Sequence, residues 1–168
     1  PPRPPGGGGG AGPGARPGAP APGRAPPHPS PPRAAHDWVN VVPVTPEGEI
    51  VMVRQYRHGA REITLEIPGG IIDPGEAPGQ AAARELLEET GYRGGEPELL
   101  GTVNPNPAVF GNRCFSYVVR GAEEVAAIQN SSTEETVVER VPAAALPRLL
   151  PEGALAHALV VAALSLLH

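Results

Sequence analysis

The sequence predicts an α/β fold in which a mixed sheet carries helices on both faces. Several β-branched or alternating segments predict strands, residues 78–90 have the periodicity of an amphipathic helix, and the chain has no internal repeat. Residues 1–33 hold 13 of the 24 prolines, 9 of the 22 glycines and little large apolar surface. We therefore expect residues 1–35 to be a disordered tail and residues 36–168 to form one domain.

Three strands are expected in the first part of the domain. A β-branched run over 37–44 and a second run over 49–56 flank the turn signal at 45–48. Residues 62–67 alternate with period two, which predicts a strand with one polar face, ended by Pro68 and the glycines after it. Tyr56, at the end of the second run, is expected in the core.

A helix over residues 78–90 is the clearest element, and Gly91 supplies its C-terminal stop. At 100° per residue its side chains divide into two faces. One face holds Gly79, Ala83, Leu86, Leu87 and Thr90, and the other holds Ala81, Glu85, Glu88 and Glu89. The acidic face is therefore expected to point away from the core.

The rest of the domain is expected to alternate strands, loops and helices. Strands are predicted at 99–103, 113–120 and 137–141, with loops at 104–112 and 122–136 and helices at 143–150 and 153–167. The last segment is apolar but too short to span a bilayer, which indicates a buried helix.

Charge and cysteine content exclude several classes of protein. The net charge is −5, but residues 36–168 carry nine basic and 18 acidic side chains, which disfavours nucleic-acid and anionic-membrane binding and suits divalent cations. Cys114 is the single cysteine, so an internal disulfide framework and a cysteine-based zinc site are excluded. A signal-peptide pattern is absent from the N-terminus, and we expect a cytoplasmic protein with no membrane partner.

Three carboxylates gather on the predicted helix. Glu85 and Glu89 are four residues apart on one face, and Glu88 lies beside them. Such a group repels itself unless a cation lies between its members, and Mg²⁺ prefers oxygen ligands of this kind. Arg84 can pair with Glu88 or with Glu76. The alternative interpretation is a solvated acidic helix face.

The same segment resembles the Nudix box, G-x5-E-x7-R-E-U-x-E-E-x-G-U, where U is a bulky apolar residue. All nine specified positions match if tyrosine is accepted at the last one, and they are Gly70, Glu76, Arg84, Glu85, Leu86, Glu88, Glu89, Gly91 and Tyr92. An acidic helix face alone does not explain the register of this cluster with Gly70 and Glu76, so the resemblance favours a catalytic site.

The resemblance implies a Nudix-like α/β/α sandwich that uses Mg²⁺, with Mn²⁺ as the alternative, to hydrolyse a nucleoside diphosphate linked to a further group. It implies that Glu85, Glu88 and Glu89 are metal ligands and that Gly69 contributes its carbonyl. It also implies that Glu76 and Arg84 hold the loop and helix together.

The branch of the family is indicated by residues outside the box. Pro107 lies 16 residues after Gly91, a spacing similar to that of the ADP-ribose pyrophosphatase and nucleotide-sugar hydrolase branch. The runs 53–57 and 65–70 are similar to that branch too. We expect Arg57 to contact phosphate, because a guanidinium binds phosphate bidentately, or otherwise to form a surface salt bridge. The similarity of the run 65–70 to that branch implies that Glu66, which lies within it, also contacts the substrate.

Two loops complete the expected site. The polar loop 104–112, with Pro107 and Asn112, can hydrogen-bond a sugar, or it can be an ordinary turn. Glu134 or Glu135 is expected to join the metal or to take a proton from water, with Glu123 and Glu124 as alternatives.

The sequence leaves three further points open. Members of this branch use an N-terminal β-region to form a dimer, but the Pro/Gly-rich segment stands in that place here, so a homodimer is left open. The expected partner is a small nucleotide substrate. Hydrolysis of nucleoside triphosphates or dinucleoside polyphosphates, or nucleotide sensing without cleavage, are the alternative functions.

Overall fold

The computed structural model describes residues 35–129 and 136–167, so all but the last residue of the predicted tail at 1–35 lies outside them. Within those ranges seven strands form one mixed sheet and two short strands form a second. The strands are β1 (Trp38–Val44), β2 (Glu49–Arg57), β3 (Glu62–Glu66), β4 (Gly69–Ile71), β5 (Tyr92–Arg93), β6 (Glu98–Val103), β7 (Cys114–Arg120), β8 (Glu123–Glu124) and β9 (Thr136–Pro142).

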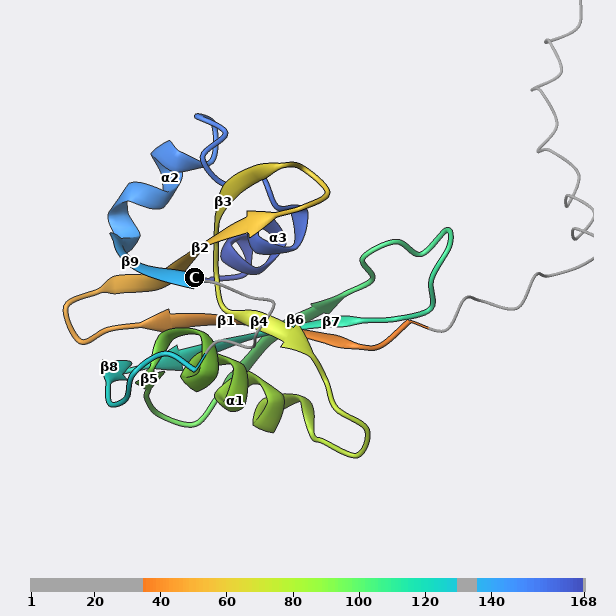
Figure 1. The fold of residues 1–168 in the computed structure, drawn as a ribbon, viewed down its shortest axis with the longest axis horizontal. Coiled ribbons are helices and arrows are strands. Elements are labelled where there is room, and N and C mark those ends of the chain that lie inside the picture. The colour runs from red at the N-terminus through yellow and green to blue at the C-terminus, as the bar shows by residue number, and fades with distance from the viewer. Residues whose placement is uncertain (1–34, 130–135, 168) are drawn as a thin grey trace, which may run out of the picture. The chain divides into compact units, whose positions relative to one another are not determined.

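Strand β1 organises the sheet. It runs parallel to β7 along its whole length and antiparallel to β4, but it meets β2 in the single register pair Val44↔Ile50. Strand β2 instead pairs with β3 and β9. The sheet therefore opens beyond the β1–β2 turn into two parts, β4–β1–β7–β6 and β3–β2–β9, as Figure 1 shows.

Alternate residues of β1 supply two hydrophobic cores, one on each face of the sheet. Val39 and Val41 pack with Leu86 on the face covered by α1 (Pro78–Thr90). Val42 packs with Val160 on the opposite face, where α3 (Ala158–Ser165) lies. This arrangement, visible in Figure 1, confirms the expected α/β/α sandwich.

Helix α1 has the predicted bounds, and Gly91 ends it with a φ of 75°, a left-handed conformation that suits glycine. The predicted division of its faces is partly wrong. Leu86 and Thr90 are buried as expected, but Ala81 and Glu89 are buried too, whereas Ala83 is exposed. The buried arc is thus displaced from the predicted apolar face toward Glu89, because α1 packs against β1, β4 and β9 together.

The β2–β3 hairpin differs from the simple alternation predicted for it. Glu66, on the expected polar face, is 3% exposed, whereas Ile63, on the expected apolar face, is 65% exposed. Tyr56, expected in the core, is 49% exposed and makes an edge-to-face contact with His58. Ile63 and Tyr56 are opposite each other near the turn of the hairpin, beyond the single register pair that joins β2 to β1.

The C-terminal helices are shorter than predicted. The first is a 3₁₀ turn (Ala143–Ala145) followed by α2 (Leu146–Leu149), and the second begins at Ala158 instead of Gly153. Gly153 has a φ of 73° and closes the turn after α2, after which the chain runs extended to bury Leu155. Among the described residues, helices long and apolar enough to cross a membrane are absent.

Candidate active site

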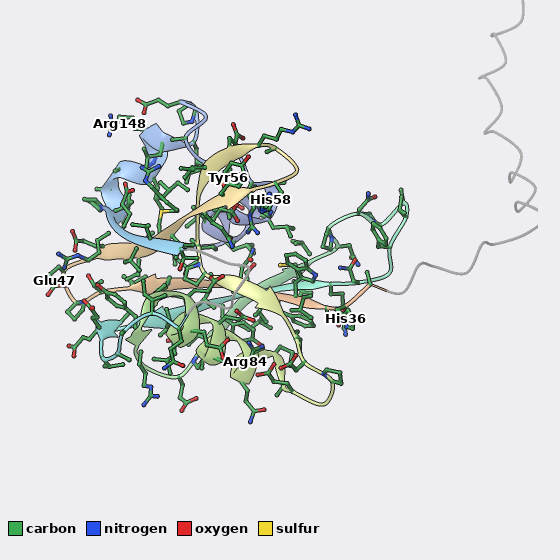
Figure 2. The ribbon with its side chains drawn as sticks, in the orientation of Figure 1. His36, Glu47, Tyr56, His58, Arg84 and Arg148 are labelled. Atoms are coloured by element: carbon green, nitrogen blue, oxygen red, sulfur yellow. The ribbon has the colours of Figure 1, made fainter. Side chains whose placement is uncertain are left out.

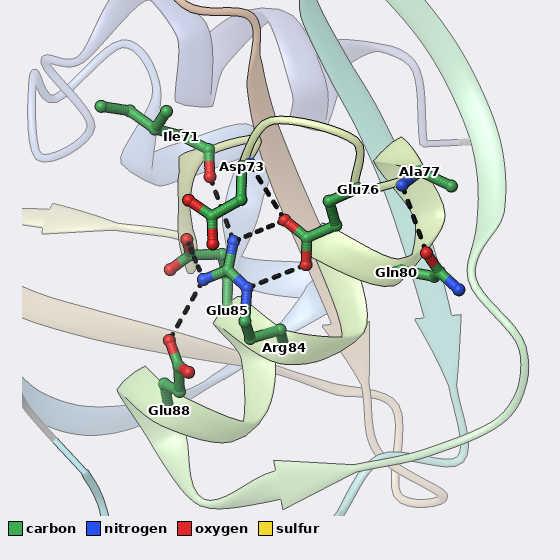
Figure 3. A network of polar contacts seen from close by, with 8 residues as sticks. All are labelled: Ile71, Asp73, Glu76, Ala77, Gln80, Arg84, Glu85 and Glu88. Atoms are coloured by element: carbon green, nitrogen blue, oxygen red, sulfur yellow. Dashed lines mark hydrogen bonds and ion pairs between the residues drawn. The ribbon is translucent and has the colours of Figure 1, made fainter.

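A single arginine holds the loop before α1 against the helix. The guanidinium of Arg84 donates from Nε and Nη2 to both carboxylate oxygens of Glu76, at 2.9 Å each. Glu76 in turn accepts from the backbone N–H of Asp73 at 3.1 Å, and Arg84 also donates to the carbonyl of Ile71 at 3.1 Å. Figure 3 shows these groups turned toward one another. The pair therefore joins the loop before α1 to the helix, and its part in the reaction stays a prediction.

Two further carboxylates meet the same guanidinium. Nη1 of Arg84 donates to Glu85 at 2.8 Å and to Glu88 at 3.2 Å (Figure 3). The side chain of Glu85 is 13% exposed, whereas that of Glu88 is 45% exposed. We call Glu76, Arg84, Glu85 and Glu88 the Arg84 cluster. It sets one positive charge among three negative ones.

The two glycines before the loop lie directly against the acidic face of α1. A Cβ at Gly70 would collide with the carboxylate of Glu85, so only glycine leaves that carboxylate its position. The backbone N–H of Gly69 donates to Glu89 Oε2 at 3.0 Å. Glu89 is 8% exposed, and Thr136 of β9 donates its hydroxyl to the Glu89 carbonyl at 2.9 Å. The contact of Gly69 seen here is through its N–H, and ligation by its carbonyl stays a prediction.

Electrostatics reinforce the Arg84 cluster. The hydrogen bond from Arg84 lowers the pKa of Glu76 against the opposing effect of burial, and the Asp73 N–H and the charge of Arg84 lower it further. The pKa of Arg84 is raised by its hydrogen bonds to Glu76 and Glu85 and by their charges, against burial. The ion pair of Arg84 with Glu76 is therefore charged on both sides at neutral pH.

The donors of this region suit a hard divalent cation. In residues 35–129 and 136–167 a finished group of three metal-binding side chains is absent. Arg84 and the Gly69 N–H donate to the carboxylates of Glu85 and Glu89. Two features make the region suitable for such a cation. The donors are carboxylate oxygens, which already surround the positive guanidinium of Arg84, and Gly70 leaves room beside the Glu85 carboxylate.

A second ion pair joins the strands of the β2–β3 hairpin. Arg57 donates from Nε to Glu66 Oε1 at 2.8 Å and from Nη2 to Oε2 at 2.6 Å, and Thr64 donates to the same carboxylate at 2.6 Å. Burial raises the pKa of Glu66, but the hydrogen bonds from Arg57 and Thr64 and the charge of Arg57 outweigh it, so this pKa is lowered. Figure 2 shows His58, next to Arg57, at the β2–β3 hairpin, apart from Arg84 on α1.

The β6–β7 loop is tied to the start of β1. Asn112 is 8% exposed and donates to the His36 carbonyl at 3.0 Å, while its carbonyl accepts from Asn104 at 3.3 Å. Pro107 is exposed in this loop, which projects away from α1 in Figure 1. The loop thus stands apart from the Arg84 cluster, and its contact with substrate stays a prediction.

The structure describes only some of the acids that were expected to activate water. Glu134 and Glu135 lie outside the described residues. Glu123 and Glu124, the alternatives, are exposed in β8, which pairs with β5 just after the end of α1.

Several residues of this region were missed by sequence reasoning. Thr64 and Thr136 fix Glu66 and the end of α1 through their hydroxyls. His157, just before α3, lies close enough to Glu66 for its charge to lower the pKa of that carboxyl. The period-two pattern carried a signal for Thr64, which is on the same strand face as Glu66. Thr136 and His157 are distant in sequence and gave none.

Comparisons with known proteins agree with this geometry. The NUDIX domain family pattern matches residues 35–164. The chain is 40% identical over 83 residues to a methanol dehydrogenase activator of Bacillus methanolicus, covering 49% of this chain and 45% of that protein. It is 50% identical over 54 residues to an ADP-ribose pyrophosphatase of Bacillus subtilis (strain 168), covering 32% and 29%. The crystal structure of an ADP compounds hydrolase superposes with a TM-score of 0.71 at 27% identity, covering 79% of this chain and 71% of that one. These two matches thus span less than half of the length of each curated relative.

Proposed function

The chain belongs to the Nudix family, and from that premise we propose that it hydrolyses the pyrophosphate bond of ADP-ribose or a similar nucleoside diphosphate sugar. The products are a nucleoside monophosphate and a sugar phosphate. Similarity to an ADP-ribose pyrophosphatase and to an ADP compounds hydrolase supports this substrate class. A cytoplasmic location stays a prediction alongside it.

The observation that carries the proposal is the Arg84 cluster with Gly70 against it. One guanidinium faces three carboxylates, and Glu89 lies one helical turn from Glu85. Glu85, Glu88 and Glu89, with the Gly69 carbonyl, would hold Mg²⁺, or Mn²⁺ in its place. A divalent cation bound there supplies charge stabilisation for the pyrophosphate and lowers the pKa of water.

The remaining roles fall to the chain's own side chains. The bond from Arg84 to Glu76 keeps the loop and Glu85 in place during the reaction. Arg57 is proposed to bind phosphate, and its bidentate bond to Glu66 fixes the plane of its guanidinium. Glu134 or Glu135 is proposed to accept the proton of the attacking water.

A substrate screen with a phosphatase-coupled assay tests the proposal. ADP-ribose, GDP-mannose, UDP-glucose, a dinucleoside polyphosphate and dGTP are compared at equal concentration with Mg²⁺ and with Mn²⁺. We expect a nucleotide sugar to give the highest kcat/KM. Preference for dGTP or the dinucleoside polyphosphate would replace the proposed substrate class, and binding without turnover would indicate a sensing module.

A further inference from the structure

A polar side chain is buried in the middle of β1, among aliphatic residues. Asn40 is 6% exposed, and its neighbours Val39, Val41 and Val42 are fully buried. An amide in such a place gives up its bonds to water, whereas a valine would suit a strand interior and would be buried at lower cost. Asn40 therefore costs stability at this position unless its contacts serve another purpose.

The amide nitrogen of Asn40 is anchored in the layer of α3. Asn40 shares a strand face with Val42, which packs with Val160 of that helix. Its Nδ2 donates to the carbonyl of Leu159, in α3, at 3.1 Å. A carbonyl inside a helix can pair with the backbone N–H four residues further on, so α3 does not need this bond to be complete. The bond instead fixes the side chain of Asn40.

The amide oxygen of Asn40 meets the backbone of Gly69. The two residues are register partners in the antiparallel β1–β4 pair. A Cβ at Gly69 would lie 2.8 Å from Oδ1 of Asn40, too close for two non-bonded atoms, and closer still to the carbonyl oxygen of Val39. Asn40 thus packs directly against Gly69 and leaves its peptide group little room to move toward α3.

Gly69 passes this contact on to the acidic face of α1. Its N–H donates to Glu89 Oε2 at 3.0 Å, and α1 covers the face of the sheet opposite α3. Gly69 is therefore held between Asn40 on one side and Glu89 on the other. Glycine has wide conformational freedom, so its N–H orients a carboxylate only as well as the glycine itself is held.

We propose that Asn40 is a positioning residue, which holds the Gly69 peptide group in the place from which it orients Glu89. The bond to Leu159 makes α3 the anchor of this contact. The inference rests on the proposed function, since it assumes that Glu89 and the Gly69 carbonyl hold a divalent cation. It gives the layer that lies away from α1 a part in metal binding.

Binding of Mn²⁺ without substrate tests the inference, because it reports on the site apart from turnover. Free Mn²⁺ is measured by electron paramagnetic resonance in titrations of the wild type, Asn40→Val and Asn40→Ala. Valine suits the interior of β1 and lacks the amide, so Asn40→Val should fold even if Asn40→Ala does not. Ser116→Ala is the matched control, because Ser116 is 1% exposed and pairs with Asn40 on the side of β1 away from β4. Melting temperatures and steady-state kinetics with ADP-ribose accompany each titration.

For Asn40→Val we expect Mn²⁺ binding about tenfold weaker and kcat about tenfold lower, with KM for ADP-ribose within about twofold of the wild type. Ser116→Ala should bind Mn²⁺ as the wild type does, even where its melting temperature falls. Wild-type Mn²⁺ affinity in Asn40→Val, an equal loss in Ser116→Ala, or a wild type that does not bind Mn²⁺ would overturn the inference. A raised KM at unchanged Mn²⁺ affinity would place Asn40 at the substrate and would overturn it too.

The same measurements separate this inference from the proposed function. If the wild type binds Mn²⁺ more tightly than Asn40→Val but cleaves no nucleotide sugar, the proposed function fails and the positioning role stands. If Asn40→Val matches the wild type in Mn²⁺ affinity and both cleave nucleotide sugars, the positioning role fails and the function stands.

Discussion

The Arg84 cluster and the Arg57–Glu66 pair are both built on a bidentate arginine, yet their charge balance differs. Arg84 faces three carboxylates, of which Glu88 is 45% exposed, so the group keeps an excess of negative charge open to solvent. Arg57 meets one carboxylate that is 3% exposed, so that pair is neutral. The Arg84 cluster therefore suits a cation. The Arg57–Glu66 pair instead joins β2 to β3 and lines one side of a cavity. Mutations should therefore affect the two sites differently.

The largest effect is expected from Glu89→Gln. Glutamine keeps the shape and can still accept the Gly69 N–H, but it removes the charge that would hold a metal. We expect kcat for a nucleotide sugar to fall by at least about a hundredfold, with little change in melting temperature. Glu47→Gln, at an exposed position in the β1–β2 turn, is the control. Wild-type turnover at saturating Mg²⁺ would remove Glu89 from the mechanism.

Gly70→Ala tests whether the position of Glu85 matters apart from its charge. The new methyl group meets the end of a flexible side chain, so the carboxylate can move away at small cost in stability. We expect kcat to fall more than tenfold at a nearly unchanged melting temperature. Gly59→Ala is the matched control, because a Cβ there meets nothing within 4 Å. Equal activity of the two variants would show that Glu85 need not occupy this position.

Arg57→Ala should lower stability as well as activity, unlike the two changes above. It leaves Glu66 buried without its charge partner, which costs about 3 kcal/mol, the lower end of the usual range because Arg57 is partly exposed. We also expect kcat/KM to fall more than tenfold through the lost phosphate contact. Urea unfolding and steady-state kinetics measure the two effects. The double variant Arg57→Ala, Glu66→Gln should recover stability but not kcat/KM, and recovery of both would make the pair purely structural.

Both sites should lose stability in acid. The pKa values of Glu66 and Glu76 lie below the ordinary glutamate value of 4.5 in the folded protein. The unfolded chain therefore takes up protons first, so the stabilisation is complete above pH 4.5 and is lost as pH falls through the lower folded values. Urea unfolding between pH 7 and pH 3 should show this decline, and Glu66→Gln should flatten it. The exposed Glu47→Gln should leave it unchanged, and a decline of the same size in Glu66→Gln would exclude Glu66 as its source.

The smallest effect is expected from deleting residues 1–33. That segment contains none of the predicted ligands or substrate contacts, so kcat/KM and the melting temperature should both stay within error of the full chain. A marked fall in either, measured on chains beginning at residue 1 and at residue 34, would assign the segment a part in the domain or its site.

The Arg84 cluster could be predicted because its members are local. A helix places residues four apart on one face, and Gly70 and Glu76 are within one loop of it. The bounds of α1 followed from such short-range rules, and the two pairings left open for Arg84, with Glu76 and with Glu88, are both present. The burial of Ala81 and Glu89 did not follow from these rules, because it depends on how many elements pack on the helix.

The sequence by itself determined a Nudix box on a loop and helix, together with the class of chemistry that its carboxylates suit. The tertiary structure decided the rest, because those contacts join residues whose approach depends on how the sheet opens at β1. Thr136 reaches the end of α1 from β9, Glu66 is buried against Arg57, and His157 meets Glu66 from the segment before α3. Local periodicity determines which side chains share a face of a helix or strand. The packing of the sheet determines which distant side chains that face contacts.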